Sequence, residues 1–190
     1  FEDLEQGCVD WELTGNHNVY NALSSIVAAK HIGILPKDAI AALAQFKNVK
    51  RRMEVIAKIN GVTIYDDFAH HPTAIRTTLE GLRAKVGRAR IIAVLEPRSN
   101  TMKLGRMKDA LPGSLAAADG VYFYATGLGW DPVSLFRATG REVRAVDLAD
   151  QLGLREREEI VVALEVGGPV AEARAAIARL SEPVILDHRA

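Results

Sequence analysis

The chain has 190 residues, of which 48% are hydrophobic and 25% are charged, as in a globular protein with a hydrophobic core. Lys plus Arg and Asp plus Glu both number 24, so the formal net charge is zero. This argues against nucleic acid or a membrane surface as a partner, because binding either usually needs a basic excess. Since Cys8 is the only cysteine, an internal disulfide and a cysteine-based zinc site are excluded, and a reducing cytoplasmic location fits.

The first 48 residues are expected to form a small, mainly helical piece. Residues 9–13 alternate apolar and polar side chains, which predicts a short strand. Apolar residues at helical spacing then predict a helix from Asn18 that ends at Gly33, and Pro36 begins a second amphipathic helix. This piece is too small for a core of its own and the chain lacks an initiator Met, so we expect a fragment of a longer protein.

A basic joint from Lys47 to Arg52 follows, and we place a domain boundary at residue 49. Alternating segments flank Asn60-Gly61, the strongest short signal for a hairpin turn. Further strands are predicted at residues 91–95, 121–124, 143–146 and 184–186. Helices are predicted at residues 72–86, 104–110, 131–138 and 170–180. The alternation predicts the α/β class, with a mostly parallel sheet and helices on both faces.

Three clusters of polar residues are candidate sites, and the first lies where the first helix begins. It comprises Gly15-Asn16-His17-Asn18, with Asn21 one turn later. Exposed amides at such a position can bind a base edge or a phosphate, because they donate and accept at fixed geometry. The alternative is helix capping by Asn16 or Asn18.

The second cluster lies between a predicted strand and a predicted helix. It is the segment Asp66-Asp67-Phe68-Ala69-His70-His71-Pro72. Ligands bind at the carboxyl ends of strands in open α/β sheets, and paired carboxylates can hold ribose hydroxyls or help to position Mg²⁺. Adjacent histidines point to different sides, so both are not expected on one metal ion. The alternative is a turn with an acidic helix cap.

The third cluster also follows a predicted buried strand. It is the segment Glu96-Pro97-Arg98-Ser99-Asn100-Thr101-Met102-Lys103. Arg98 and Lys103 are cations, and arginine suits bidentate binding, so a substrate-carboxylate site is predicted here. The alternative is a solvated loop that carries charges. Trp11 and Trp130 are expected to pack against neighbours rather than to stack on a ligand.

The sequence contains no complete phosphate-binding loop, dinucleotide-binding fingerprint or nucleophile elbow. An enzyme built on one of these motifs is therefore not expected from this chain alone. A stand-alone binding module is one alternative.

In this order, the three clusters resemble motifs of the Mur ligase family of peptidoglycan synthesis, over residues 9–136. Gly15-x-His17-Asn18-x-x-Asn21-Ala22-Leu23 resembles a motif of the central ATP-binding domain. Arg52-Met53-Glu54 resembles the start of the C-terminal domain, and Tyr65 to Pro72 resembles a loop that reaches the nucleotide. Glu96 to Gly105 is similar to the recycling member of the family, whereas the alanine-adding member has a His-Arg-containing sequence there.

The resemblance implies a Rossmann-like C-terminal domain at residues 49–190, after a remnant of the central domain at residues 1–48. It implies an ATP- and Mg²⁺-dependent ligase that joins the murein tripeptide L-alanyl-γ-D-glutamyl-meso-diaminopimelate to UDP-N-acetylmuramate through an acyl phosphate. The fragment alone is expected to be inactive, because in the family the phosphate loop and the UDP-sugar domain, the rest of the same chain, precede Phe1. The alternative within the family is addition of L-alanine.

The resemblance also assigns roles to twelve residues. The nucleotide is implied to contact His17, Asn18 and Asn21 at the adenine, Arg52 at the phosphates, and Asp66 or, in preference, Asp67 at the ribose. The active-site cleft is implied to include His70 and His71. The carboxylates of the peptide are implied to meet Arg98, Ser99, Asn100 and Lys103. No residue is assigned as a metal ligand, and no role is carried over beyond residue 147, where the tail departs from the family's glycine-rich pattern.

Overall fold

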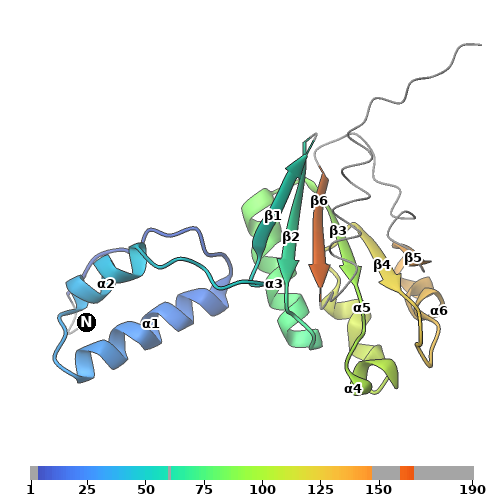
Figure 1. Ribbon diagram of the computed structural model, residues 1–190, viewed down its shortest axis with the longest axis horizontal. Coiled ribbons are helices and arrows are strands. Elements are labelled where there is room, and N and C mark those ends of the chain that lie inside the picture. The colour runs from blue at the N-terminus through green and yellow to red at the C-terminus, as the bar shows by residue number, and fades with distance from the viewer. Residues whose placement is uncertain (1–3, 60, 147–158, 165–190) are drawn as a thin grey trace, which may run out of the picture.

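The computed structural model of the chain describes residues 4–59, 61–146 and 159–164. The strands are β1 (Glu54–Ile59), β2 (Val62–Asp67), β3 (Arg90–Leu95), β4 (Gly120–Tyr124), β5 (Glu142–Val146) and β6 (Glu159–Leu164). These described strands form one sheet in the order β1-β2-β6-β3-β4-β5 (Figure 1). β1 is antiparallel to β2, and all other neighbouring pairs are parallel. The predicted α/β class with a mostly parallel sheet is confirmed.

The described helices are α1 (Asn16–His31), α2 (Pro36–Ala44), α3 (Pro72–Val86), α4 (Asn100–Lys103), α5 (Leu111–Ser114) and α6 (Pro132–Phe136). Two short 3₁₀ segments, η1 (Lys108–Ala110) and η2 (Arg137–Thr139), precede α5 and follow α6. No helix in the described part of the chain is long and apolar enough to cross a membrane.

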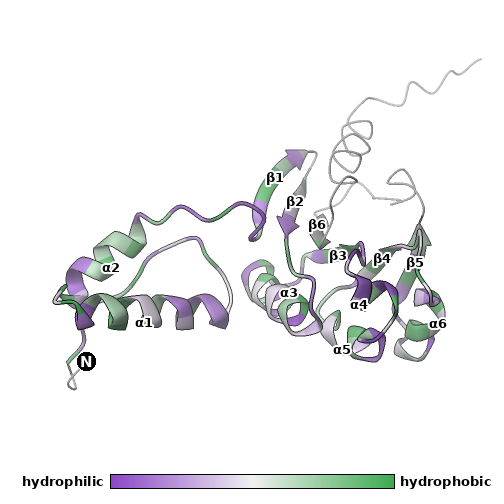
Figure 2. Ribbon diagram, turned by 60° about the horizontal axis from the view of Figure 1, so that its bottom comes forward, coloured by the Kyte–Doolittle hydropathy of each residue, from purple (hydrophilic) through white to green (hydrophobic). Residues whose placement is uncertain are grey.

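The hydrophobic core lies on both faces of the sheet, because successive strand residues face opposite sides. The larger cluster joins Ile91, Ala93, Val121 and Phe123 to the helices α3, α5 and α6, which lie along one side of the sheet (Figure 2). The smaller cluster on the other face contains Val62, Ile64, Ile92, Tyr122 and Val161. Helix α3 buries Ile75, Leu79 and Leu82 completely, and each contributes at most roughly 1.5–3 kcal/mol to folding.

The hairpin and helix α3 form where the sequence predicts them. Residues of β1 and β2 pair from Glu54 opposite Asp66 to Ile59 opposite Val62, with an irregularity between Val55 and Ala57. Gly61 has a φ of +80°, which glycine adopts without the strain a side chain would add. The turn residue Asn60, the predicted helix at residues 170–180 and the predicted strand at residues 184–186 lie outside the described residues.

Strand β6 was not predicted, although residues 160–164 form a continuous apolar run of the kind found in covered strands. It lies between β2 and β3, with Leu164 opposite both Asp67 and Leu95. The carboxyl ends of β2 and β3 are therefore level, two strand spacings or about 10 Å apart.

Two predicted elements are wrong. The predicted helix at residues 104–110 is instead a turn at residues 104–107 followed by the 3₁₀ segment η1, because Gly105 adopts a φ of +70° just after α4. Residues 9–13 form no strand, since they pair with no strand in the described part of the chain, and an alternating pattern needs a hydrogen-bonded neighbour to become a strand.

Helices α1 and α2 pack against each other and lie to one side of the sheet (Figure 1). Their existence confirms the prediction, but the stripe Val19, Leu23 and Val27 is 52%, 53% and 63% exposed. The stripe is therefore not part of a core within the described chain.

A pair of glycines brings α1 against α3. A Cβ on Gly81 would lie 2.9 Å from the Cα of Gly15, closer than side-chain atoms approach backbone. Gly15 itself has a φ of +88°, and its own Cβ would meet the His17 ring at 2.8 Å. The absence of two side chains thus allows the start of α1 to touch the middle of α3.

Candidate functional site

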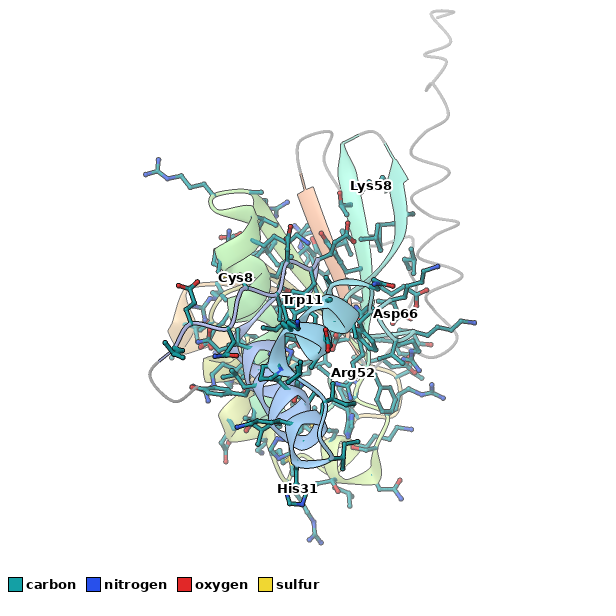
Figure 3. The ribbon with its side chains drawn as sticks, turned by 90° about the vertical axis from the view of Figure 1, so that its left-hand side faces the viewer. Cys8, Trp11, His31, Arg52, Lys58 and Asp66 are labelled. Carbon is teal, nitrogen blue, oxygen red and sulfur yellow. The ribbon has the colours of Figure 1, made fainter. Side chains whose placement is uncertain are left out.

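A cleft of about 390 Å³ lies between helix α1, the basic joint and the β2–α3 region, within the usual size range of small-ligand sites. We call it the joint cleft. Five of the residues predicted to bind nucleotide line it: His17, Asn18, Asn21, Arg52 and Asp67. Figure 3 labels Trp11, Arg52 and Asp66 in the central part of the view; Trp11 and Arg52 line the cleft, and Asp66 does not. Residues from both sides of the predicted domain boundary thus share one cleft.

The side chains at the start of α1 are held by local hydrogen bonds. Asn18 donates from Nδ2 to the Thr14 carbonyl at 2.7 Å, and Asn21 donates to the Asn18 Oδ1 at 3.5 Å. The N-cap is Gly15, without a side-chain hydrogen bond, so the alternative of capping by Asn16 or Asn18 is wrong. The side-chain amides of Asn18 and Asn21 thus line the cleft and do not cap the helix.

Asp67 is the most extensively bonded polar group of the cleft. Its Oδ2 accepts from the Met53 backbone N–H at 2.9 Å and its Oδ1 from the Ala69 N–H at 2.8 Å. The Thr78 hydroxyl lies 3.5 Å from Oδ1. Burial raises the pKa of the Asp67 carboxyl, against the lowering effect of the two backbone hydrogen bonds. Because each carboxylate oxygen has two lone pairs, Oδ2 retains capacity for one further donor.

Asp66 points to the opposite side of the strand from Asp67, as successive strand residues do. Its Oδ2 lies 3.3 Å from Nε of Arg51, while its buried Oδ1 has no hydrogen-bond partner among the described residues. Burial raises the pKa of the Asp66 carboxyl despite the nearby Arg51 guanidinium. Asp66 does not line the joint cleft, so the structure separates the two adjacent carboxylates that the sequence places together.

The joint itself is fastened to the turn after β2. Arg51 and Met53 have φ values of +59° and +52°, which non-glycine residues adopt only when their surroundings hold them. The Arg51 carbonyl accepts from the Phe68 N–H at 2.8 Å, and its guanidinium lies 5.0 Å above the Phe68 ring. Together with the Met53–Asp67 bond, these contacts fix where the joint leaves the sheet.

His70 and His71 have opposite ring tautomers, because their hydrogen-bond partners differ. The His70 Nδ1 lies 2.9 Å from the Phe68 carbonyl, which can only accept, so this nitrogen carries the proton. The His71 Nδ1 accepts from the Thr73 N–H at 3.3 Å, so its proton is on Nε2. His71 therefore caps α3, and the alternative of an acidic cap is wrong.

The predicted carboxylate loop, residues 98–103, follows β3 at the same edge of the sheet. Ser99 caps α4 by accepting from the Met102 N–H at 3.3 Å. The Arg98 side chain is 52% exposed and its Nε lies 3.6 Å from a Glu96 oxygen. Both cations, Arg98 and Lys103, are thus exposed. They follow β3, which is separated by β6 alone from β2, the strand that ends at Asp67. None of the four predicted residues of this loop lines the joint cleft.

Several residues for which no ligand contact of their own was predicted also line the joint cleft. They are Trp11, Tyr65, Thr78 and Lys85. Thr78 and Lys85 lie on α3, and they face the joint cleft only because of how α3 packs in the folded chain. No local sequence pattern therefore predicts that they line it. Trp130 packs edge-on against Phe123 with ring centroids 5.8 Å apart, which confirms its predicted packing role.

The described residues fit an adenine nucleotide better than they fit Mg²⁺. The joint cleft offers amides, the Asp67 Oδ2 and the cations Arg52 and Lys85. Among these residues no three His, Cys, Asp or Glu side chains gather as a metal site, and both Asp67 oxygens already accept backbone hydrogen bonds. The described residues therefore contain no ready-made cluster of metal ligands.

Comparison with known proteins gives close relatives in one enzyme family. UDP-N-acetylmuramate–L-alanyl-γ-D-glutamyl-meso-2,6-diaminoheptandioate ligase of Escherichia coli K12 is 60% identical over 117 residues, 61% of this chain and 26% of that enzyme. The crystal structure of a murein peptide ligase from Psychrobacter arcticus 273-4 is 37% identical with a TM-score of 0.70, over 97% of this chain and 41% of that one. UDP-N-acetylmuramate–L-alanine ligase of Roseiflexus castenholzii is 34% identical over 182 residues, 94% of this chain and 34% of that enzyme.

This chain spans between about a quarter and two fifths of the length of these relatives. A family model described as "Mur ligase, glutamate ligase domain" matches residues 51–185, which is most of the chain. The chain therefore belongs to the Mur ligase family.

Proposed function

We propose that this chain is the C-terminal part of an ATP-dependent ligase that joins L-alanyl-γ-D-glutamyl-meso-diaminopimelate to UDP-N-acetylmuramate in the cytoplasm, during peptidoglycan recycling. The observation that carries the proposal is the 60% identity over 117 residues to the tripeptide ligase of Escherichia coli. Alanine ligases are 48% identical over 83 residues (Clavibacter sepedonicus) and 34% identical over 182 residues (Roseiflexus castenholzii). Residues 1–48 would belong to the central ATP-binding domain and residues 49–190 to the C-terminal domain. The start of the family match at residue 51 supports that division.

The joint cleft is the proposed nucleotide site. His17, Asn18 and Asn21 would contact the adenine and Arg52 the phosphates, since all four line the cleft. Of the two carboxylates, we assign the ribose to Asp67, because it lines the cleft and its Oδ2 retains a lone pair. Asp66 is instead directed to Arg51.

In the proposed reaction, ATP supplies the phosphoryl group that activates the carboxylate of UDP-N-acetylmuramate. The chain's own residues then handle protons and charge beside the reacting carbonyl. His70, with its proton on Nδ1, presents Nε2 as an acceptor for the proton of the incoming amine. His71, with its proton on Nε2, presents a donor for the oxygen that becomes negative as the amine attacks. Two adjacent histidines thereby take complementary roles, set by Phe68 and by the start of α3.

The carboxylate loop would bind the incoming peptide, whose carboxylates include one from diaminopimelate. Arg98 and Lys103 supply exposed positive charge, and Ser99 and Asn100 supply polar groups at the start of α4. The level carboxyl ends of β2 and β3 support this, because the loop and the turn that carries His70 and His71 leave the sheet from strand ends about 10 Å apart.

Addition of L-alanine is the second candidate, since the alanine ligase from Roseiflexus castenholzii aligns over 94% of this chain. An assay of the full-length protein distinguishes the tripeptide ligase from the alanine ligase. Phosphate release is measured with UDP-N-acetylmuramate and either tripeptide or L-alanine. We expect release with tripeptide and little with L-alanine; a preference for L-alanine would refute the tripeptide assignment.

The Arg98→Ala variant sharpens this test. It should raise the tripeptide KM by roughly ten-fold or more, the usual effect of losing one charge-assisted bond, and leave the ATP KM unchanged. An equal rise in the KM of the tripeptide and the KM of ATP would contradict the assignment of Arg98 to the peptide site. The 190-residue chain alone should bind ATP weakly without turnover, because it contains no phosphate-binding loop.

A further inference from the structure

The helix inside the carboxylate loop is too short to hold its own shape. Helix α4 has four residues, whereas isolated helices shorter than about 12 residues are marginal in water. The turn that follows the helix supplies part of the missing support, since the Gly105 N–H donates to the Met102 carbonyl at 3.0 Å. The position of Arg98 to Lys103 therefore depends on further contacts from outside the loop.

Two consecutive residues of the β4–α6 connection bind the end of α4. The indole Nε1–H of Trp130 donates to the Met102 carbonyl at 2.9 Å. The Gly129 backbone N–H donates to the Lys103 carbonyl at 3.2 Å. The Met102 side chain is buried in the main core cluster, so α4 is held by its buried face and by its last two carbonyls.

Trp130 is itself fixed by the core. Its ring meets the buried Phe123 of β4 at an interplanar angle of 79°, and Phe123 in turn contacts Phe136 with centroids 5.5 Å apart. On the loop side, a Cβ on Gly105 would lie 2.9 Å from Cδ1 of Trp130. Gly105 also has a φ of +70°, so glycine is required there for two independent reasons.

We propose that Trp130 is a positioning residue for the incoming peptide: it transfers the rigidity of the β4 core to the carboxylate loop and so sets the affinity for the peptide. It touches neither the joint cleft nor His70 and His71 in the described structure, so its influence is confined to the peptide side. The proposal rests on the proposed function, since it takes residues 98–103 as the peptide site.

The test compares three variants of the full-length protein. Trp130→Phe keeps a ring against Phe123 and removes the Nε1–H donor, and Gly105→Ala pushes on the indole from the loop side. Phe136→Leu is the matched control, because it loosens the same aromatic cluster without contacting α4. For Trp130→Phe we expect the tripeptide KM to rise roughly three- to ten-fold, the effect of one lost hydrogen bond, with ATP KM unchanged. Gly105→Ala should act in the same direction, and Phe136→Leu should lower the melting temperature without the KM change.

Hydrogen exchange gives a readout that needs no catalysis. In Trp130→Phe without ligands, the amides of residues 102–107 should exchange faster than in the wild type and in Phe136→Leu. Unchanged exchange, or an equal rise of both KM values in Trp130→Phe, would overturn the positioning role. If exchange is faster in Trp130→Phe but the wild-type protein ligates no tripeptide, the proposed function is overturned instead, so the two failures are distinguishable.

Discussion

Replacing Asp67 by Asn tests whether the buried carboxylate fastens the joint to the sheet. Asp67 accepts from the N–H groups of Met53 and Ala69 through different oxygens, and it is 3% exposed. Asn has the same shape but only one oxygen, so its NH₂ group would face one of these donors. One hydrogen bond to a charged acceptor is lost and one buried N–H stays unpaired, which together should cost about 2–3 kcal/mol.

The free energy of unfolding at pH 7 measures this loss, by urea titration followed through tryptophan fluorescence. For a chain of this size, about 2–3 kcal/mol corresponds to a fall of about 5–10 °C in melting temperature. Asp131→Asn is the control, because Asp131 caps α6 at the surface and Asn caps helices as well as Asp does. ATP binding should weaken in Asp67→Asn, since Met53 is released beside the joint cleft.

An Asp67→Asn variant as stable as the wild type would refute this reasoning. It would mean that the joint is held by its other contacts, the Phe68–Arg51 backbone bond and the guanidinium over the Phe68 ring. Lower stability with unchanged ATP affinity would retain the fastening role but remove Asp67 from the nucleotide site.

Three further predictions concern the joint cleft and the turn after β2. Gly81→Ala should weaken ATP binding several-fold, because its Cβ would press on Gly15, whereas Gly113→Ala, with nothing within 4 Å, should not; equal ATP affinities in a calorimetric titration would contradict this. Because the pKa of the Asp66 carboxyl is raised in the folded protein, folding favours the protonated carboxyl. The stability that this protonation contributes is complete at pH values below 3.8, the ordinary pKa, and is lost as the pH rises through the raised pKa of the folded protein. In denaturation at several pH values, wild type should therefore gain stability relative to Asp66→Asn as pH falls, and a parallel pH dependence would count against it. His71→Asn should keep the α3 cap and the melting temperature but lose the Nε2 donor, so ligation by the full-length protein should fall by about 10²–10³ in kcat; unchanged kcat would exclude the proposed donor role.

Local signals predicted the parts of the fold that local chemistry controls. The Asn60-Gly61 turn predicts the β1–β2 hairpin, and Pro72 with the helical stripe after it predicts α3 at its observed bounds. In contrast, the predicted helix at residues 104–110 ignores Gly105, whose left-handed backbone ends α4. The Trp130 ring, from 25 residues further along the chain, also leaves no room for a Cβ at Gly105, and no local pattern contains that contact.

The sequence predicted which clusters of residues make up the candidate site, but it did not predict how these clusters are arranged in space. The sequence places Asp66 and Asp67 together, but strand alternation sends one to Arg51 and the other to the joint cleft. The apolar run of β6 is visible in the sequence, yet its place between β2 and β3 depends on the packing of the whole sheet. The roles of the twelve residues remain predictions, since only their positions are given by the structure.

The place of β6 also bears on how the site is assembled. Strands β2 and β3 carry the two site loops, and both pair with β6, at residues 159–164. This strand begins 93 residues after Asp66 and 63 residues after Glu96. Long-range pairing of this kind forms slowly, because the intervening chain must first be ordered. A chain ending before residue 159 would thus contain all twelve candidate residues without the strand that sets the spacing of their loops. During synthesis, the spacing of the two site loops can therefore be set only after residue 164 has been added to the chain.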